Sequence, residues 1–508
     1  MKSIRIICRK SRLSLLQAEL VKQRILLVAP DAEVIIIGRS SKGDRELSVP
    51  LSVLDGSDFF TEEIFAALQN GEADIAVHSL KDMSARHFFS HTAFATPDRE
   101  DLRDVAIFNP DIVSKIESGA TLIIGTSSPR REEMAVRFLK KALPQLGREI
   151  QIETRPIRGN VERRLQLLES GAYDATILAT AGLNRLLGSS EDAPGVRALL
   201  KDKKYMLLPL VECVPAPCQG IIVAEADPAN QEAVAILSKI NDERVWKEAI
   251  SEKQKGSEFG AGCLQKFGVA TLKTRHTAHL YAAGVDSNGR EFSAWSGLPE
   301  FSYEGKNFFS STDYMRNFFQ YRWEQALPAL NAPVVFVANY KALQQQGLKE
   351  LLQSKVIWAS GTKTWYELAK MGLWVQGSAD AMGFEQLLPS LQMPLLNLSK
   401  DDLMILTHKK AAERWRIKGY NAQSNYELVP VSDAVVQSKM AQAEFVFWSS
   451  FSQYELYKSV IRSNVRHLCA GGETAELLRQ HGIEPILFPT IKAFEQWRST
   501  NISSISAV

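Results

Sequence analysis

The segment Asp74-Ile-Ala-Val-His-Ser-Leu-Lys-Asp82 consists of a short apolar strand that runs directly into a polar turn. The same order of apolar strand, polar turn and helix recurs at residues 3–8, 122–125 and 173–178 and the segments that follow them. Alternating strands and helices are typical of doubly wound sheets, in which ligands bind beyond the carboxyl ends of the strands. We therefore expect an α/β fold in which two such sheets face each other across a cleft.

The composition is that of an ordinary globular protein. The chain has 508 residues, of which 45% are hydrophobic and 23% charged, and this length suggests roughly three to four domains. The formal net charge of +2 gives no bulk attraction for nucleic acid, and no apolar run approaches the roughly 20 residues of a membrane span. Five irregularly spaced cysteines, without Cys-x-x-Cys or His-Glu-x-x-His motifs, argue against disulfides and a metal site. We expect a cytoplasmic protein with neither a nucleic-acid nor a membrane partner, and we take a monomer as the working expectation.

Cationic and hydroxyl side chains gather at the turns that follow these strands. A helix start exposes free N–H groups, and a guanidinium group binds carboxylates or phosphates through two parallel hydrogen bonds. Solvated basic helix faces are the alternative interpretation, but Arg158 precedes a predicted helix and Arg164 lies about a turn and a half into it, so both can face one ligand. The pattern predicts a cleft for a ligand with several negative charges. The residues concerned are Arg9, Ser11, Thr126, Ser128, Arg130, Arg131, Arg158, Arg164 and Arg185.

Two further features could carry chemistry. Lys81 and Asp82 lie together at the carboxyl end of a predicted strand, where they form either a solvated ion pair or a site that holds the aspartate charged toward a cationic substrate. Glu258-Phe-Gly-Ala-Gly-Cys263 places a thiol after glycines that permit an open turn facing a cleft, which would suit covalent attachment. A buried, inert cysteine is the alternative interpretation of Cys263.

Six short motifs stand in a definite order along the first part of the chain. They are Val77-His-Ser-Leu-Lys-Asp82, Gly125-Thr-Ser-Ser-Pro-Arg-Arg131, Arg158-Gly-Asn-Val-Glu-Arg-Arg164, Ala179-Thr-Ala-Gly-Leu-Asn-Arg185, Pro217-Cys-Gln-Gly220 and Gly262-Cys263. In order and spacing they resemble the porphobilinogen deaminase family, also called hydroxymethylbilane synthase, over about residues 1–330. The resemblance implies condensation of four porphobilinogen molecules into hydroxymethylbilane, with loss of ammonia, on a dipyrromethane primer held as a cysteine thioether.

By position, the resemblance implies roles for individual residues. Cys263 would carry the dipyrromethane. Asp82, beside Lys81, would be the catalytic aspartate that stabilises the developing substrate cation and handles pyrrole N–H protons. The basic and hydroxyl residues named above, together with Gln219, would contact the primer or the substrate, whose acetate and propionate groups account for the many arginines.

The chain departs from the family pattern at three places. Asp55-Gly-Ser-Asp-Phe-Phe60 stands where the family has Gly-Gly-Lys-Gly-Leu-Phe, so a lysine is lost and acidic residues are gained. Cys218 and Lys266 replace a glycine and a proline. These departures bear on loop dynamics and rate, and Cys218 offers a second thiol that could compete with Cys263.

The resemblance also implies a domain organisation. Residues 1–98 with 215–242, and residues 99–214, would form two doubly wound lobes as in periplasmic binding proteins, and residues 243–330 a small α+β third domain carrying the cofactor cysteine. Within that domain Asp286-Ser-Asn-Gly289 predicts a hairpin turn and residues 313–327 an amphipathic helix. A linker at 328–333 would lead into a further module at 331–508.

The last part of the chain contains an internal repeat. A strand followed by Gly361-Thr-Lys-Thr364 and a helix recurs 110 residues later (471 − 361) as a strand followed by Gly471-Gly-Glu-Thr474 and a helix. The repeat predicts two related α/β units. Each threonine suits a helix N-terminal cap, but two such helix starts could also face one cleft and bind carboxylates.

This part resembles uroporphyrinogen-III synthase, with residues 377–384 and 469–475 as its best matches. The resemblance implies ring closure of the first module's product, with loss of water, at a site containing Thr364, Tyr426, Ser450 and Thr474. The family's opening strand is not evident in the sequence. A degenerate domain that only binds or supports the deaminase is therefore the alternative. A less favoured alternative for the whole chain is a two-lobed anion-binding protein without enzyme activity.

Overall fold

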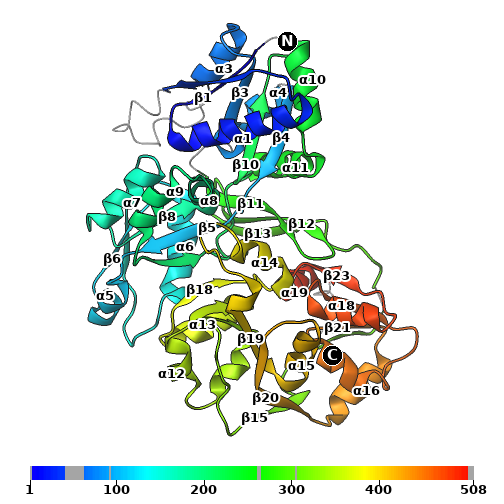
Figure 1. The fold of residues 1–508 in the computed structure, drawn as a ribbon. Coiled ribbons are helices and arrows are strands. Elements are labelled where there is room, and N and C mark those ends of the chain that lie inside the picture. Colours follow the sequence, from blue (N-terminus) through cyan, green and yellow to red (C-terminus); the bar gives the residue numbers. More distant parts are fainter. Residues whose placement is uncertain (1–2, 41–61, 91–92, 260–264, 304–305, 502–508) are drawn as a thin grey trace.

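The computed structural model describes residues 3–40, 62–90, 93–259, 265–303 and 306–501. These residues form five β-sheets with helices packed around them, which confirms the predicted mixed α/β class. Figure 1 shows one lobe at the top of the molecule, a second lobe below it, and a larger C-terminal module beneath both. Cys263 and the segment from Asp55 to Phe60 lie outside the described residues.

Domain 1, the upper lobe, is built on a five-stranded sheet in the order β2-β1-β3-β10-β4. Strands β1, β2 and β3 are parallel, whereas β10 is antiparallel to both neighbours. Ile4 and Ile6 of β1 belong to the same buried cluster as Val21 and Ile25 of α1, so the apolar face of the strand packs against the helix. The elements are β1 (Ile4–Arg9), α1 (Arg12–Val28), β2 (Val34–Arg39), α3 (Glu62–Gln69), β3 (Ile75–Ser79), the 3-10 turn η2 (Leu80–Asp82), α4 (Ala85–Ser90), β4 (Phe94–Arg99), β10 (Ile221–Glu225) and α10 (Gln231–Ile240).

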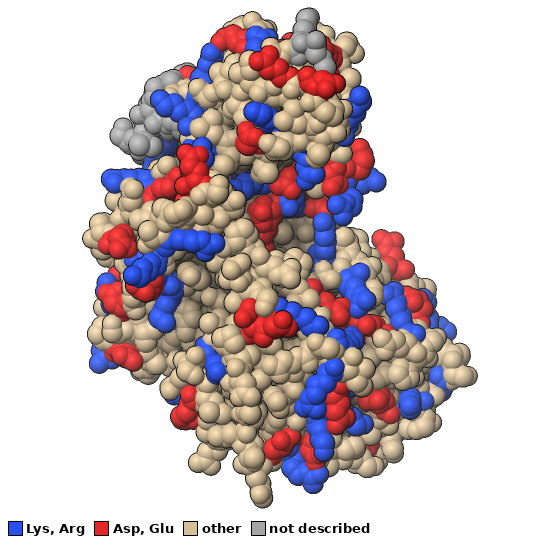
Figure 2. All heavy atoms as spheres, in the orientation of Figure 1, with Lys and Arg blue, Asp and Glu red and all other residues tan. Residues whose placement is uncertain are grey.

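Domain 2 is built on a second five-stranded sheet, in the order β7-β6-β8-β5-β9. Here β6 is parallel to β7 and β8, and β5 is antiparallel to β8 and β9. Residues 100–103 and residues 208–220 cross between the two lobes, and Figure 2 shows acidic and basic side chains crowded along the narrow waist below domain 1. The elements are β5 (Asp104–Phe108), α5 (Ile112–Ser118), β6 (Leu122–Gly125), α6 (Pro129–Ala142), β7 (Ile152–Arg155), α7 (Val161–Glu169), β8 (Ala175–Ala179), α8 (Thr180–Leu187), α9 (Ala193–Leu200) and β9 (Lys204–Leu207).

Domain 3 consists of helix α11 (Glu243–Phe259) packed on the antiparallel sheet β11 (Lys266–Lys273), β12 (Ala278–Val285) and β13 (Glu291–Ser296). The hairpin predicted at Asp286 is confirmed, since β12 pairs with β13 and the Asp286 carboxylate accepts hydrogen bonds from the backbone N–H groups of Asn288 and Arg290. Helix α11 and strand β11 flank the segment 260–264, which contains Cys263. The position of these two elements therefore determines where that segment starts and ends.

The amphipathic helix expected over residues 313–327 is absent, and this prediction was wrong. Residues 308–310 form β14 (Phe308–Ser310), which pairs with β21, and residues 319–323 form β15 (Phe319–Trp323), which pairs with β20. Aromatic residues favour strands, and alternate side chains of β15 lie half-buried against the C-terminal module. Both strands belong to C-terminal sheets, so the domain boundary expected at residue 330 lies before Phe308.

The C-terminal module contains a six-stranded sheet, β15-β20-β19-β16-β17-β18, and a four-stranded sheet, β14-β21-β22-β23. The sequence repeat corresponds to parallel pairs of strands that lead into a helix, β16 and β17 before α13, and β21 and β22 before α18. The remaining bounds are β16 (Val334–Val337), η3 (Tyr340–Gln344), α12 (Leu348–Gln353), β17 (Val356–Ala359), α13 (Thr362–Lys370), β18 (Val375–Ser378), η4 (Phe384–Gln386), α14 (Leu388–Leu391), η5 (Lys400–Asp402), β19 (Leu403–His408), α15 (Lys409–Ile417), β20 (Ala422–Pro430), α16 (Ala434–Gln442), β21 (Phe445–Trp448), α17 (Phe451–Tyr457), β22 (Arg466–Ala470), α18 (Glu473–Gln480), β23 (Ile486–Phe488) and α19 (Ile491–Asn501).

Domain 2 and the C-terminal module share one apolar core. Trp365 of α13 is 0% exposed, lies edge-on to Phe138 of α6 with 5.1 Å between ring centroids, and donates its Nε1 hydrogen bond to the carbonyl of Ala142 (3.1 Å). Trp374 packs against Phe108 of β5 in the same way, also at 5.1 Å. The two parts are therefore packed together as closely as a single domain.

Replacement of Trp365 by alanine should destabilise both parts at once. Removing a fully buried tryptophan leaves a cavity at this interface and is expected to lower the free energy of unfolding by about 3–5 kcal/mol. Urea unfolding followed by circular dichroism would measure the change. Trp365→Phe is the matched control and should lose only about 1–2 kcal/mol, because most of the ring remains and chiefly the hydrogen bond is lost. A loss below about 1 kcal/mol for the alanine variant would contradict the shared core.

Within the part of the chain that the structure describes, no helix is both long and apolar enough to cross a membrane. The same described residues contain no group of three or more histidine, cysteine, aspartate or glutamate side chains that could hold a metal ion.

Candidate functional site

A cavity of about 720 Å³ lies between domains 1 and 2. Its domain 1 wall consists of the carboxyl ends of β1 and β3 with the starts of α1 and η2. Its domain 2 wall consists of the loop before α6, the β7–α7 connection and the junction of β8 with α8. Strand ends of both sheets therefore meet at one cleft, which is where doubly wound sheets bind ligands.

The charges that line this cavity are almost all positive. Eight cationic side chains line it, and Asp82 is the one carboxylate among the described lining residues. Burial, and then the charges of Arg131 and Arg158, lower the pKa of Arg164 to about 10. A ligand with several carboxylates would relieve this repulsion, so the cavity fits such a ligand. The cations are Arg9, Lys10, Lys81, Arg131, Arg158, Arg163, Arg164 and Arg185.

Asp82 and Lys81 reach the cavity because the 3-10 turn η2 follows β3 directly. Strand β3 lies at the centre of the domain 1 sheet, between β1 and β10, so the turn projects from the middle of the sheet edge. Burial lowers the pKa of Lys81 and nearby Arg131 lowers it further, whereas the negative charge of Asp82 raises it. The turn thus presents one carboxylate to a cavity rich in cations.

Comparison with known proteins identifies this architecture. The family model "Porphobilinogen deaminase, dipyromethane cofactor binding domain" matches residues 4–235. The chain is 37% identical over 269 residues to a probable porphobilinogen deaminase of Methanocaldococcus jannaschii, a match covering 53% of this chain and 82% of that protein. It is 32% identical over 265 residues to the porphobilinogen deaminase of Streptococcus sanguinis, covering 52% and 80%. The chain belongs to the porphobilinogen deaminase family.

The deaminase half therefore takes a dipyrromethane cofactor. The cavity fits this group, since the pyrrole carboxylates would meet closely spaced cations, among them Arg164, whose pKa is lowered by burial and then by the charges of Arg131 and Arg158. These matches cover about half of the chain. Among solved structures, the substrate binding protein of an amino acid ABC transporter covers 50% of the chain at 14% identity and a TM-score of 0.25, which is too low to support an argument.

Of the twelve described residues predicted for the deaminase site, eight line the cavity and four do not. The eight come from both lobes, so the fold brings together motifs that are up to 176 residues apart in the chain (185 − 9). Those in the cavity wall are Arg9, Ser11, Lys81, Asp82, Arg131, Arg158, Arg164 and Arg185, and those outside it are Thr126, Ser128, Arg130 and Gln219.

Arg130 and Gln219 were expected at the deaminase ligand, but the structure places them at the crossovers between the lobes. Both donate to the buried carboxylate of Asp104, at the start of β5, over 2.7 and 2.9 Å. Arg130 also donates to the carbonyl of Val214 in one crossover, and Gln219 to that of Leu102 in the other (2.7 and 2.8 Å). Their polar groups tie the two crossovers together instead of facing the cavity.

Thr126 and Ser128 also lie away from the cavity lining. Thr126 is 1% exposed, and its hydroxyl accepts the backbone N–H of Ser128 (3.2 Å). Ser127, between them, lines the cavity and donates its hydroxyl hydrogen bond to the carbonyl of Ile157 (2.9 Å). Ser127 was not among the residues predicted for the site. Lys10, Asn160 and Arg163, which stand beside predicted residues in the sequence, also line the cavity and were not predicted.

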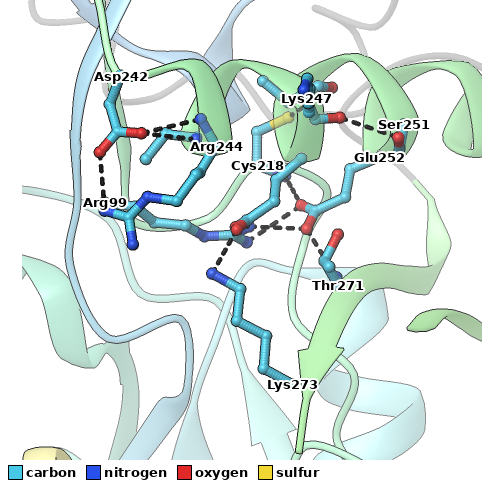
Figure 3. Close-up of polar contacts among 12 residues, drawn as sticks. Arg99, Cys218, Asp242, Arg244, Lys247, Ser251, Glu252, Thr271 and Lys273 are labelled. Atoms are coloured by element: carbon cyan, nitrogen blue, oxygen red, sulfur yellow. Dashed lines mark hydrogen bonds and ion pairs between the residues drawn. The ribbon is translucent and has the colours of Figure 1, made fainter. Parts of the chain in front are cut away.

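Domain 3 is attached to β4 and to the second crossover through the buried carboxylate of Glu252 on α11 (Figure 3). Glu252 accepts hydrogen bonds from both terminal nitrogens of Arg99 (2.8 and 3.1 Å) and from the backbone N–H groups of Cys218 and Thr271 (both 2.7 Å). Because Thr271 belongs to β11, one side chain joins both elements that flank residues 260–264 to the end of β4 and to the second crossover. Cys218 is 0% exposed and burial raises the pKa of its thiol to about 12, so it is a poor competitor for covalent attachment.

The four residues predicted for the second site are divided between the two halves of the module: Thr364 and Tyr426 belong to the six-stranded half, and Ser450 and Thr474 to the four-stranded half. Thr364, 5% exposed, is in the first turn of α13, with its hydroxyl oxygen 3.1 Å from that of Ser360. Tyr426 is 1% exposed in β20, and burial raises the pKa of its phenol. Ser450 caps α17 reciprocally with Gln453, and Thr474 lies in the first turn of α18.

Hydroxyl-bearing residues also follow strand β14. Ser311, directly after it, donates its hydroxyl hydrogen bond to Ser449 (3.1 Å) and accepts the backbone N–H of Ser449 (2.8 Å). Ser449 precedes Ser450 at the end of β21, so hydroxyl groups meet at one edge of the four-stranded sheet. The sequence signal for these hydroxyl groups is the run Ser310-Ser-Thr312 after two phenylalanines.

Two carboxylates, those of Glu473 and Glu476, lie in the first turn of helix α18. Glu473 pairs with Arg414 (3.4 Å) and Glu476 with Lys418 (3.1 Å), both on the six-stranded half of the module. Arg275 of domain 3 also pairs with Glu476 (2.9 Å). Because these carboxylates occupy the first turn, their negative charges disfavour the binding of an anion at the start of α18. The sequence repeat had suggested an anion site there.

Proposed function

We propose that the chain performs two consecutive steps of tetrapyrrole synthesis, in which the deaminase half joins porphobilinogen units into hydroxymethylbilane and the C-terminal module closes this product to uroporphyrinogen III. The observation that carries the first step is the cavity between the lobes, which eight cations line together with Asp82. Each porphobilinogen unit adds an acetate and a propionate, so the growing chain needs many cationic partners.

Within this cavity, the cationic residues and Asp82 would have different roles. The arginines bind and orient the acetate and propionate groups through paired hydrogen bonds. When bound through Cys263, the dipyrromethane supplies the free pyrrole carbon to which the first substrate unit is joined. Asp82 stabilises the positive charge that develops as the substrate loses ammonia and accepts a pyrrole N–H proton.

The second step is supported by the start of α13, where Thr364 lies, and by the hydroxyl groups at the ends of β14 and β21. Hydroxyls such as those of Ser450 and Thr364 can hold carboxylates of a flexible linear tetrapyrrole, and ring closure depends more on holding its ends together than on strong acids or bases. The module would thus consume the product of the deaminase half within the same chain.

A supporting role without catalysis is the second candidate for this module. The core shared through Trp365, and the ion pairs of Glu473 and Glu476 at the start of α18, are specific observations that favour it. In that case the bilane would leave the deaminase and close spontaneously.

The distribution of uroporphyrin isomers separates the two candidates. Purified full-length protein is given porphobilinogen, the products are oxidised, and isomers I and III are separated. Spontaneous closure of the bilane gives isomer I. Dominance of isomer III would therefore indicate that the module catalyses ring closure, whereas dominance of isomer I would indicate that it has only a supporting role. Removal of the C-terminal module is a poor control, because it would expose Phe138 and Phe108 of domain 2, which pack against Trp365 and Trp374.

The site assignment is tested with Tyr426→Phe and the matched control Tyr321→Phe, whose ring lies 6.0 Å from that of Tyr426. Each variant loses only a hydroxyl group. If Tyr426 orients the bilane, its variant should shift the products from isomer III toward isomer I by about 10-fold, a loss of about 1.4 kcal/mol in discrimination, with an unchanged rate of bilane formation. An unchanged isomer ratio in Tyr426→Phe would remove this residue from the site.

A further inference from the structure

A loop of the C-terminal module reaches both crossovers that join the deaminase lobes. Asp380, in the loop Ala379–Met382, is 1% exposed, and its Oδ2 accepts a hydrogen bond from Arg103 in the first crossover (3.3 Å). Burial raises the pKa of Asp380 to about 6, whereas Arg103 and the backbone N–H groups of Leu210 and Val211, in the second crossover, favour its charged form. One carboxylate of the C-terminal module therefore lies against both connections.

The same part of the C-terminal module makes further polar contacts with the deaminase half. Ser390 accepts a hydrogen bond from Arg103 and donates one to Asp101, both over 2.7 Å. The backbone N–H of Leu395 donates to the side chain of Asn184 on α8 (3.2 Å). The first crossover is thus held from the side of the C-terminal module by a charged group and a hydroxyl.

The loop keeps an unusual backbone conformation to make these contacts. Asp380 and Ala381 have φ values of 53° and 58°, in the left-handed region that residues with a Cβ rarely adopt. The backbone N–H of Ala381 donates to the carbonyl of Ser360 (2.9 Å), and a Cβ at Gly361 would approach that of Ala381 to 3.2 Å. Such conformations persist where the surroundings impose them, and they cluster at functional sites.

Open space lies beside this contact. A second cavity, of about 440 Å³, is lined by residues 97–103 of β4 and the first crossover, by α11, and by Ala379, Met382 and Ser390. The first crossover is therefore not enclosed by packed atoms on this side, so the contacts from Asp380 and Ser390 limit its movement. This movement matters because Asp82 and Arg185 face the catalytic cavity from different lobes.

We propose that the C-terminal module sets the relative position of the deaminase lobes, with Asp380 and Ser390 as positioning residues that hold the crossovers. The eight cations that surround the substrate come from both lobes, so their spacing follows the geometry of the crossovers. A more mobile crossover would let the two lobes adopt more relative orientations. The fraction of molecules in the orientation that binds substrate productively would then fall. This role is independent of whether the module closes the bilane.

The test is Asp380→Asn, alone and combined with Ser390→Ala, in the full chain. The asparagine keeps the size of the side chain and removes its charge. The double variant should raise the KM for porphobilinogen about 10-fold, change kcat less, and accelerate amide hydrogen exchange of residues 100–103 and 208–220 about 10-fold. Glu484→Gln is the matched control, because it breaks the exposed pair with Arg479 elsewhere in the same module and should change neither quantity.

Two outcomes would overturn the proposal. One is an unchanged KM and unchanged exchange at the crossovers in the double variant. The other is a lower unfolding temperature without either local effect, which would mean that the contacts only add stability. If the double variant does not fold, Ser390→Ala alone leaves the pair of Arg103 with Asp101 in place (2.8 Å) and should show the same changes at about 3-fold.

Discussion

Replacing Cys263 with alanine should yield a chain whose mass equals that predicted from its sequence and which forms no hydroxymethylbilane. The deaminase family uses a dipyrromethane cofactor, and Cys263 ends the glycine-rich motif assigned to its attachment. Without the thiol no thioether can form, so the first substrate unit has no primer. Intact-mass spectrometry of the purified protein and an assay of bilane formation measure the two effects.

Cys218→Ala is the matched control for this experiment. The thiol of Cys218 is fully buried, and burial raises its pKa to about 12, so the thiolate needed for attachment is scarce there. This variant should keep the added mass of the cofactor. Added mass that persists in Cys263→Ala and disappears in Cys218→Ala would show that the attachment site had been misassigned.

Asp82→Asn should reduce kcat by about 10²- to 10⁴-fold while the covalent cofactor stays in place. The asparagine has nearly the same shape, but it removes the one carboxylate among the described residues that line the cavity. A developing positive charge surrounded by eight cations would then have no negative partner there. Steady-state consumption of porphobilinogen gives kcat, and intact mass reports the cofactor.

Asp98→Asn is the comparison for Asp82, since it removes a carboxylate at the lobe junction that pairs with Arg185 (3.5 Å) but does not line the catalytic cavity. Its kcat should fall less than about 10-fold. The role of Asp82 is refuted if Asp82→Asn retains kcat within that same range, or if it loses the cofactor mass as Cys263→Ala does.

Local sequence patterns predicted the site residues correctly where those residues lie directly after a strand or at the start of a helix. The apolar run before Lys81 and Asp82 predicts a central strand that ends at a ligand edge, and these residues do line the cavity. Arg158 and Arg164 were also located, because a helix start restricts which way its residues can point. Neighbouring residues at one helix start were harder to separate. Arg131 lines the cavity and Arg130 points to Val214, although they are adjacent in the chain.

The pattern was misleading where two periodicities overlap. Phe319, Tyr321 and Trp323 alternate as in a strand, but with Tyr314 and Phe318 they also fit helical spacing. Pairing with β20, about 100 residues later, decides in favour of the strand, because its backbone groups are satisfied there and its rings pack on the module. A pairing over such a distance leaves no trace in the local sequence.

The sequence by itself determined the chemistry of this protein: a strand that ends in Lys81 and Asp82, turns rich in arginine, and a thiol after glycines. The tertiary structure alone decided which of these side chains meet. Arg103 and Asp380 lie 277 positions apart, yet they form a buried ion pair at the crossovers. Such contacts depend on how whole domains pack, and packing is set by the summed burial of many side chains rather than by any one segment.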